Sequence, residues 1–250
     1  MARRKNFVSH GIKVFFALIL AIFIINRIVG TKAISKQEEY EKKLKGDPRD
    51  VNAILSLADT YYKKAIHIDS EESIPFLEGT IALCENAQEL EESTRTLFLL
   101  GKAYFEMAKY TEDKNDLYDK AQKSFLSCIK KGLNSEELFI LLGHTWLIRG
   151  YLNEAIDAYN NALSINPNNP FIISNIAFSY KEKGELDKAL SILKKIEEPI
   201  DKNLYIMIHL LFGEIYERKG LFLLAKKEYI SVLKKDKRNK KAKAAMKRLS

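Results

Sequence analysis

The sequence is poor in the two residues that most often interrupt regular structure. Only 11 glycines and 5 prolines occur among its 250 residues, whereas 46% of the residues are hydrophobic and 30% are charged. A fold built of many short strands needs turn residues at short, regular intervals. The scarcity of these residues therefore argues against such a fold and favours long helices.

Cysteine is almost absent as well. The two cysteines, Cys84 and Cys128, do not form a Cys-x-x-Cys motif or any zinc-ligand spacing. Both fall on apolar positions of expected helices, so we predict buried free thiols. A single disulfide in an oxidising compartment is the alternative.

Sequence motifs of catalysis are missing. The chain has no phosphate-binding loop, no dinucleotide fingerprint, no Gly-x-Ser-x-Gly and no His-Glu-x-x-His. Its four histidines, His10, His67, His144 and His209, are scattered. We therefore predict a protein that is not an enzyme and that uses no cofactor and no metal.

The net charge of +8 is concentrated at the two ends. Residues 1–13 contribute +4 and residues 234–250 contribute +8, so residues 14–233 carry −4. A nucleic-acid-binding domain is expected to spread its basic residues over a folded face, so we predict no nucleic-acid partner. The basic residues of 234–248 have three interpretations: a solvated capping helix, a contact with anionic lipid, or a contact with an acidic protein.

One long apolar run is present near the N-terminus. It covers Val14–Ile25 and follows a basic leader, residues 1–13. Since about 20 apolar residues cross a bilayer comfortably, we extend the run to residues 14–29, with Lys13 and Arg27 reaching toward the headgroups. This predicts a single-pass signal anchor in an inner membrane, with a cytoplasmic N-terminus and the remaining chain in the periplasm. A cleaved signal peptide and a buried soluble helix are the alternatives.

Three segments, 137–170, 171–196 and 206–238, repeat one pattern. Each has an apolar–small pair, an aromatic residue three positions later, and then a glycine that would cap the first helix. A second helix follows with its anchors at spacings of four and three, on one face. We expect the small residue to let the second helix approach closely and the first-helix aromatic to fill the gap beside it. The anchors are Gly143, Trp146, Ala155, Tyr159, Ala162 and Pro167 in the first segment, and Ala177, Tyr180, Gly213 and Tyr216 in the others.

This pattern resembles the tetratricopeptide repeat (TPR) family, in which Trp-x2-Leu-Gly-x2-Tyr is followed by Ala-x3-Phe-x2-Ala and a proline. Two upstream copies share the first-helix pattern, at Leu57-Ala58 and Leu100-Gly101. Their second helices are delayed by polar insertions near 64–73 and 109–117, which either lengthen the helices or form loops.

The resemblance implies an all-α fold: a right-handed α-solenoid of about five TPR-like helix pairs, with an N-terminal transmembrane helix and a C-terminal capping helix. Residues 30–50 then form a lead-in helix and linker, with the helix at 33–45. The expected repeats are 51–93, 94–135, 136–169, 170–205 and 206–239, and residues 240–250 form the basic capping helix.

The resemblance also implies that partner proteins bind as a peptide or helix in a concave groove lined by the first helices. We therefore predict a membrane-anchored scaffold or adaptor for envelope complex assembly, in secretion, envelope biogenesis or the flagellar motor. The alternatives are an organelle-surface receptor whose cytosolic repeats recognise targeting segments, and an accessory subunit of an enzyme complex. The expected groove residues are Leu55, Tyr62, Phe98, Lys102, Phe105, Ile140, His144, Leu147, Phe171, Phe178, Met207 and Leu210.

Overall fold

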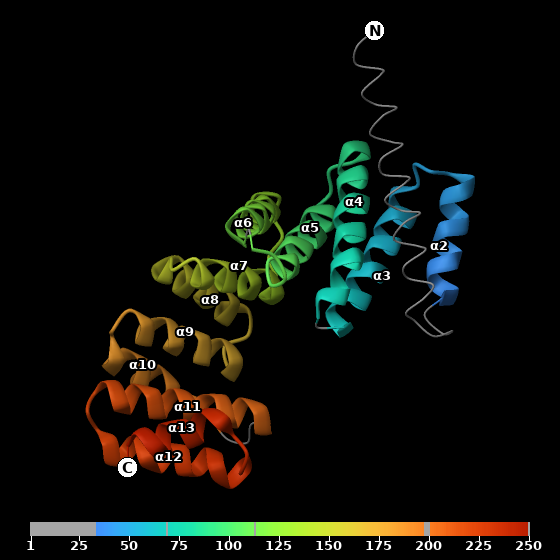
Figure 1. Cartoon of the computed structure of the whole chain (residues 1–250). Helices are drawn as coiled ribbons and strands as arrows, with labels where there is room; N and C mark the ends of the chain where they lie inside the picture. The colour runs from blue at the N-terminus through green and yellow to red at the C-terminus, as the bar shows by residue number, and fades with distance from the viewer. Residues whose placement is uncertain (1–33, 69, 113, 198–200, 250) are drawn as a thin grey trace. The chain divides into compact units, whose positions relative to one another are not determined.

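The computed structural model describes residues 34–68, 70–112, 114–197 and 201–249, and every regular element in these ranges is a helix (Figure 1). The predicted leader (1–13) and signal anchor (14–29) lie outside the described residues. Among the helices that are described, none is both long enough and apolar enough to span a bilayer.

The chain folds as two compact units that divide between Asn134 and Ser135. The described part of the N-terminal unit contains α2 (Ile34–Gly46), α3 (Val51–Ile68), the short 3-10 helix η1 (Glu71–Ser73), α4 (Ile74–Leu90), α5 (Thr94–Met107) and α6 (Lys114–Lys130). Here α3 pairs with α4 and α5 with α6, while α2 packs on α3. The described residues of this unit thus form the lead-in helix and two helix pairs.

The described residues of the C-terminal unit form three helix pairs and one further helix. Each first helix packs on the second helix that follows it, and α13 packs on α12. The elements are α7 (Glu136–Ile148), α8 (Leu152–Ile165), α9 (Pro170–Glu182), α10 (Leu186–Leu193), α11 (Lys202–Arg218), α12 (Phe222–Lys235) and α13 (Lys240–Arg248).

Local chemistry sets where these helices begin and end. At each of the starts of α5 and α7 a serine side chain caps the helix: Ser93 accepts a hydrogen bond from the amide of Thr96 (3.1 Å), and Ser135 accepts one from Leu138 (3.2 Å). The turn glycines of the three C-terminal pairs are left-handed, with φ of +80° at Gly150, +80° at Gly184 and +71° at Gly220. They end the first helices as expected from the repeat pattern.

The two polar insertions behave differently. The first lengthens both helices of its pair, since α3 has 18 residues and α4 has 17, with η1 between them. The second lengthens α6 to 17 residues, whereas α5 ends at Met107 after 14. For comparison, α7 and α8 have 13 and 14 residues.

Close packing inside the pairs depends on a small residue facing an aromatic ring. A Cβ added at Gly213 would lie 2.5 Å from a ring carbon of Tyr229, and one at Gly101 would lie 2.5 Å from the ring of Phe125. Gly143 faces Tyr159 in the same way. These three rings belong to second helices and are fully buried. A side chain at these glycines would therefore collide with the core.

In the α7–α8 and α11–α12 pairs the ring that faces the small residue belongs to the second helix, so the prediction that first-helix aromatics fill this gap is wrong there. Trp146, Tyr180 and Tyr216 are only half-buried, and the Trp146 ring packs against Tyr151 of the turn, with ring centroids 5.3 Å apart. Tyr180 and Tyr216 nevertheless pack against the core of this unit. The predicted role is found in the α3–α4 pair, where the ring of Tyr61 lies 2.8 Å from the Cβ position of Gly79. The anchors Ala155, Ala162 and Ala177 are fully buried, and Pro167 is exposed beyond the end of α8.

Both cysteines are free and buried, as predicted. Burial raises the pKa of the Cys84 thiol to about 12 and that of Cys128 to about 11. Because a thiolate is the reactive form of cysteine, both sulfurs are chemically inert at neutral pH.

Candidate protein-binding surface

In the N-terminal unit a shallow pocket of about 260 Å³ lies between the first helices α3 and α5. Its lining is Asp59 from α3 together with Arg95, Phe98, Leu99 and Lys102 from α5. Two first helices therefore form the pocket, on the side of the repeats where partner binding was expected.

The pocket combines positive charge with aromatic surface. The ammonium nitrogen of Lys102 lies 4.7 Å from the ring centroid of Tyr62 and 5.3 Å from that of Phe98. The only acid, Asp59, is 2.5 Å from Lys63 and is already paired. With Arg95 also in the lining, the pocket is suited to a carboxylate carried next to an apolar group.

In the C-terminal unit, α7 and α9 present an apolar strip. The ring of His144 packs edge-on against Phe171, with centroids 5.8 Å apart, and against Tyr159 at 5.7 Å. Phe171 is 37% exposed and Ile148 is 54% exposed, while Ile140 and Leu147 are half-buried. We call Ile140, His144, Leu147, Ile148 and Phe171 the apolar strip.

Ile148 belongs to the strip although it was not among the predicted residues. It lies four residues after His144, so both fall on the same face of α7. That spacing would have identified it in the sequence.

Three of the predicted groove residues are instead part of the core. Leu55, Tyr62 and Phe105 are only 2%, 7% and 6% exposed. Tyr40 and Leu44 of the lead-in helix pack against the cluster that contains Leu55 and Tyr62. The ring of Phe105 packs against Tyr118 at 5.8 Å, at the start of the lengthened α6. The prediction fails because segments outside the repeat pattern cover these positions.

Phe98, Phe178, Met207 and Leu210, which were also predicted to line the groove, are half-buried. Phe98 packs its ring against Phe125 of α6 with centroids 6.1 Å apart, and Leu210 packs against the core between α12 and α13. Phe178 lies beneath the ammonium of Lys181 at 4.3 Å, and Met207 is half-buried on α11. The structure thus brings Phe98 together with Lys102, and His144 together with Phe171.

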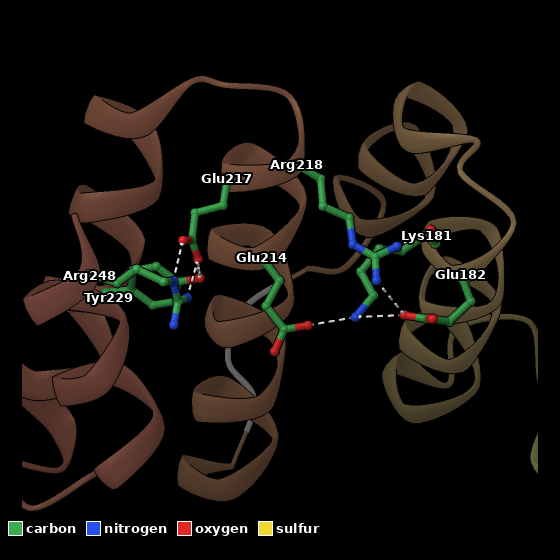
Figure 2. A network of polar contacts seen from close by, with 7 residues as sticks. All are labelled: Lys181, Glu182, Glu214, Glu217, Arg218, Tyr229 and Arg248. Carbon is green, nitrogen blue, oxygen red and sulfur yellow. Dashed lines mark hydrogen bonds and ion pairs between the residues drawn. The ribbon is translucent and has the colours of Figure 1, made fainter.

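A polar network joins α9 to α11, and the sequence pattern did not reveal it (Figure 2). The buried Lys181 ammonium lies 2.5 Å from Glu214 and 3.1 Å from Glu182. Arg218 donates a hydrogen bond to the backbone carbonyl of Lys181 (2.8 Å) and pairs with Glu182 (3.2 Å). Because that carbonyl lies in the last turn of α9, Arg218 also caps this helix.

The network marks a change of chemistry along the first helices. Lys181 occupies the place that Leu147 holds in the preceding copy, and Glu214 occupies the place of His144 and Phe178. The apolar strip on α7 and α9 therefore ends at an ionic patch on α9 and α11. Aligning the copies position by position would have shown this replacement.

A second polar cluster holds the final helix in place (Figure 2). The Glu217 carboxylate of α11 accepts a hydrogen bond from the Tyr229 hydroxyl (2.6 Å) and two from the Arg248 guanidinium (3.0 and 2.8 Å). The bond from Arg248, supported by that from Tyr229, holds the pKa of Glu217 below its usual range. This cluster joins three helices and has a structural role.

Nothing in the described residues resembles a metal centre, since no three His, Cys, Asp or Glu side chains gather there. The first helices present apolar and charged side chains at the surface, and such side chains are suited to binding another protein.

Comparison with known proteins points to one family. Residues 143–184 match the family model described as TPR repeat. The TPR repeat-containing protein MJ1428 of Methanocaldococcus jannaschii is 25% identical over 169 residues, which cover 64% of this chain and 27% of that protein. The chain spans about a quarter of the length of the curated relatives it matches.

Solved structures share the fold. PilW, a type IV pilus biogenesis factor, aligns with a TM-score of 0.63 at 14% identity, covering 92% of this chain and 98% of its own. YrrB, described as a TPR protein with an unusual peptide-binding site, aligns with a TM-score of 0.59 at 19% identity, covering 84% and 99%. The repeat pattern, the helix pairs built around Gly143 and Gly213, and these matches agree: residues 143–184 match the TPR repeat, and the chain has the fold of tetratricopeptide repeat proteins.

Proposed function

We propose that this protein is a non-enzymatic scaffold that binds a partner protein on the first-helix faces of its repeats. The apolar strip on α7 and α9 is the observation that carries the proposal. Phe171 and Ile148 are substantially exposed there, although the helix pairs obtain their cores from other residues. Exposed apolar side chains gathered on one face are typical of a binding surface.

The chemistry of the surface favours a particular kind of partner. An amphipathic helix or an extended peptide would place its apolar side chains against the strip. In the N-terminal unit, an acidic residue beside an apolar one would suit the pocket formed by Arg95, Lys102 and Phe98. The peptide-binding site attributed to YrrB is an example of such use in a protein of this fold.

A more specific proposal concerns where the protein is located in the cell and which process it serves. Residues 14–29 would anchor the protein in the inner membrane, with the repeats in the periplasm, where it would help to assemble an envelope complex. The apolar run and its basic leader support this placement. PilW, a type IV pilus biogenesis factor, is an example of a protein with this fold that takes part in building a surface assembly.

The test of partner binding is a double substitution in the strip. Replacing Phe171 and Ile148 by serine should abolish capture of the partner in a crosslinked pull-down from native membranes, because the apolar contact is lost. The matched control is Ile165→Ser on the second helix α8, since Ile165 is 41% exposed and Phe171 is 37% exposed. Capture that survives the double substitution, in a protein of unchanged helicity, would eliminate the strip as the binding surface.

A further inference from the structure

The last second helix, α12, has an unusual outward face. Leu223, Lys227, Ile230 and Lys234 follow one another at spacings of four, three and four, so they form one stripe along the helix. All four side chains are exposed, Leu223 by 84% and Ile230 by 43%. We call these four residues the outward stripe.

The preceding copies show that the fold does not need these residues. Aligned on Gly150, Gly184 and Gly220, the second helices bury the same small anchor, which is Ala155, Ala189 or Ala225. Their outward stripes nevertheless differ, because those of α8 and α10 contain no apolar residue. The equivalent positions are Asn153, Asp157 and Asn160 after the first glycine, and Asp187, Ser191 and Lys194 after the second, all exposed.

The residues around the outward stripe are also mostly apolar or positively charged. Leu221, Phe222 and Leu224 are also exposed around the first turn of α12. From residue 221 to the end of the chain the only acids are Glu228 and Asp236. Glu228 lies 2.5 Å from His209, and Asp236 accepts a hydrogen bond from the amide of Arg238 (3.0 Å). The region therefore presents apolar side chains in a strongly positive field.

We propose that the outward stripe and the first turn of α12 dock on the surface of an anionic lipid bilayer. The apolar side chains would enter the boundary between headgroups and acyl chains. Lys227 and Lys234, on the same face, would lie with their stems along that boundary and their ammonium groups among anionic headgroups. The lysines of α13, which packs on α12, add to the attraction.

A bilayer fits this surface better than a protein does. Lysine is depleted at the centres of protein–protein interfaces, because its ammonium group must be desolvated there. On the outward stripe the lysines alternate with the apolar residues. A partner protein that covered the apolar residues would therefore also bury the lysines inside the interface, rather than leave them at its solvent-exposed rim. At a bilayer the same alternation places each charge at the depth of the headgroups.

The test uses the full-length chain in nanodiscs that differ only in headgroup charge, either zwitterionic or containing phosphatidylglycerol. An environment-sensitive fluorophore is attached to the cysteine of the Leu223→Cys variant, or to that of Asn153→Cys at the equivalent position of α8. The protein without an introduced cysteine is the labelling control, because its two native thiols are buried. Quenching by neutral acrylamide should fall severalfold at position 223 in the anionic discs and remain unchanged at position 153. Equal quenching at position 223 in both discs would overturn the proposal.

Charge reversal separates a lipid surface from other partners. Lys227→Glu with Lys234→Glu should abolish the protection at position 223, whereas Lys194→Glu with Lys195→Glu at the end of α10, which makes the same charge change, should not. Raising the salt from 0.1 to 1 M should have a similar effect, because the screening length falls from about 10 to about 3 Å. Protection that persists after charge reversal, or that appears without lipid as the protein is concentrated, would instead indicate a protein contact and refute the bilayer. The first-helix faces take no part in this test, so its outcome is separate from that of partner binding.

Discussion

Two tyrosines that occupy the same place in two of the repeat copies have hydroxyl groups in different surroundings. The ring of Tyr159 packs on Gly143 and that of Tyr229 packs on Gly213. The Tyr229 hydroxyl donates to the Glu217 carboxylate, whereas the buried Tyr159 hydroxyl has no hydrogen-bond partner within the described residues. Burial raises the pKa of both tyrosines well above the usual value.

Removing the same oxygen atom from each tyrosine should therefore have opposite consequences. Tyr159→Phe should leave the free energy of unfolding unchanged or increase it by up to about 1 kcal/mol, because an unsatisfied polar group is removed. Tyr229→Phe should lower it by about 1–2 kcal/mol, because a hydrogen bond to a carboxylate is lost. Urea denaturation of the full chain measures both values, and equal losses would contradict the assignment.

The sequence predicts residues well where the repeat pattern itself provides the contact. Gly143, Ala155 and Ala162 could be placed in the core because their spacing puts them against the paired helix. Leu55 and Phe105 could not be placed correctly. Leu44 of the lead-in helix packs against the cluster that contains Leu55, and Tyr118 of the lengthened α6 packs against Phe105. Neither the lead-in helix nor this insertion has a counterpart in the other copies. A periodic pattern contains no information about such segments.

At the scale of elements, α13 closes the C-terminal unit. It packs its alanines 242 and 245 against the face of α12 that carries Ala225, Tyr229 and Val232. Arg248 also binds Glu217 across the pair. The helix thereby shields an apolar face of α12 from solvent.

The pair between Arg248 and Glu217 should make the stability of this closure depend on pH. The folded state depresses the pKa of Glu217, so the pair contributes fully above the usual glutamate value of about 4.3, and its contribution is lost as the pH falls through the depressed value. We therefore expect Arg248→Gln to lower the thermal unfolding midpoint at pH 7 and to lose this effect in strong acid. Circular dichroism melts across acidic pH measure the difference, and a pH-independent gap would show that Arg248 acts only through packing.

Helix ends were predictable where their signals belong to the repeat. The left-handed glycines ended α7, α9 and α11 as expected. The repeat pattern predicts a copy that begins at residue 206, whereas α11 begins at Lys202, because the Asp201 carboxylate accepts hydrogen bonds from the amides of Asn203 (2.8 Å) and Leu204 (3.0 Å).

At the scale of the whole molecule, the division at Asn134–Ser135 was not expected. Nothing in the local sequence marks it, since Ser135 caps α7 as Ser93 caps α5 inside the N-terminal unit. Unit boundaries depend on how many long-range contacts cross a turn, and composition does not reveal that quantity. The candidate site was predictable as a face of the first helices, and its change from apolar to ionic at Lys181 becomes visible only when the copies are aligned position by position.

The proposed topology gives the molecule a definite orientation that fusion reporters can measure. A phosphatase reporter that is active only after export, fused after residue 250, should be active in the full chain, because the short basic leader is retained in the cytoplasm. Deleting residues 1–33 should abolish that activity and provides the control. A C-terminus that reports from the cytoplasm would favour the receptor alternative and would leave the TPR fold untouched.

The inert sulfurs of Cys84 and Cys128 bear on how the protein is made. The chain has no other cysteine, and these two are free, buried and protonated at neutral pH. No covalent cross-link therefore has to form, or be corrected, before the helices reach their final packing. We therefore expect the chain to reach the same structure under reducing and oxidising conditions, without help from a thiol oxidase or a disulfide isomerase.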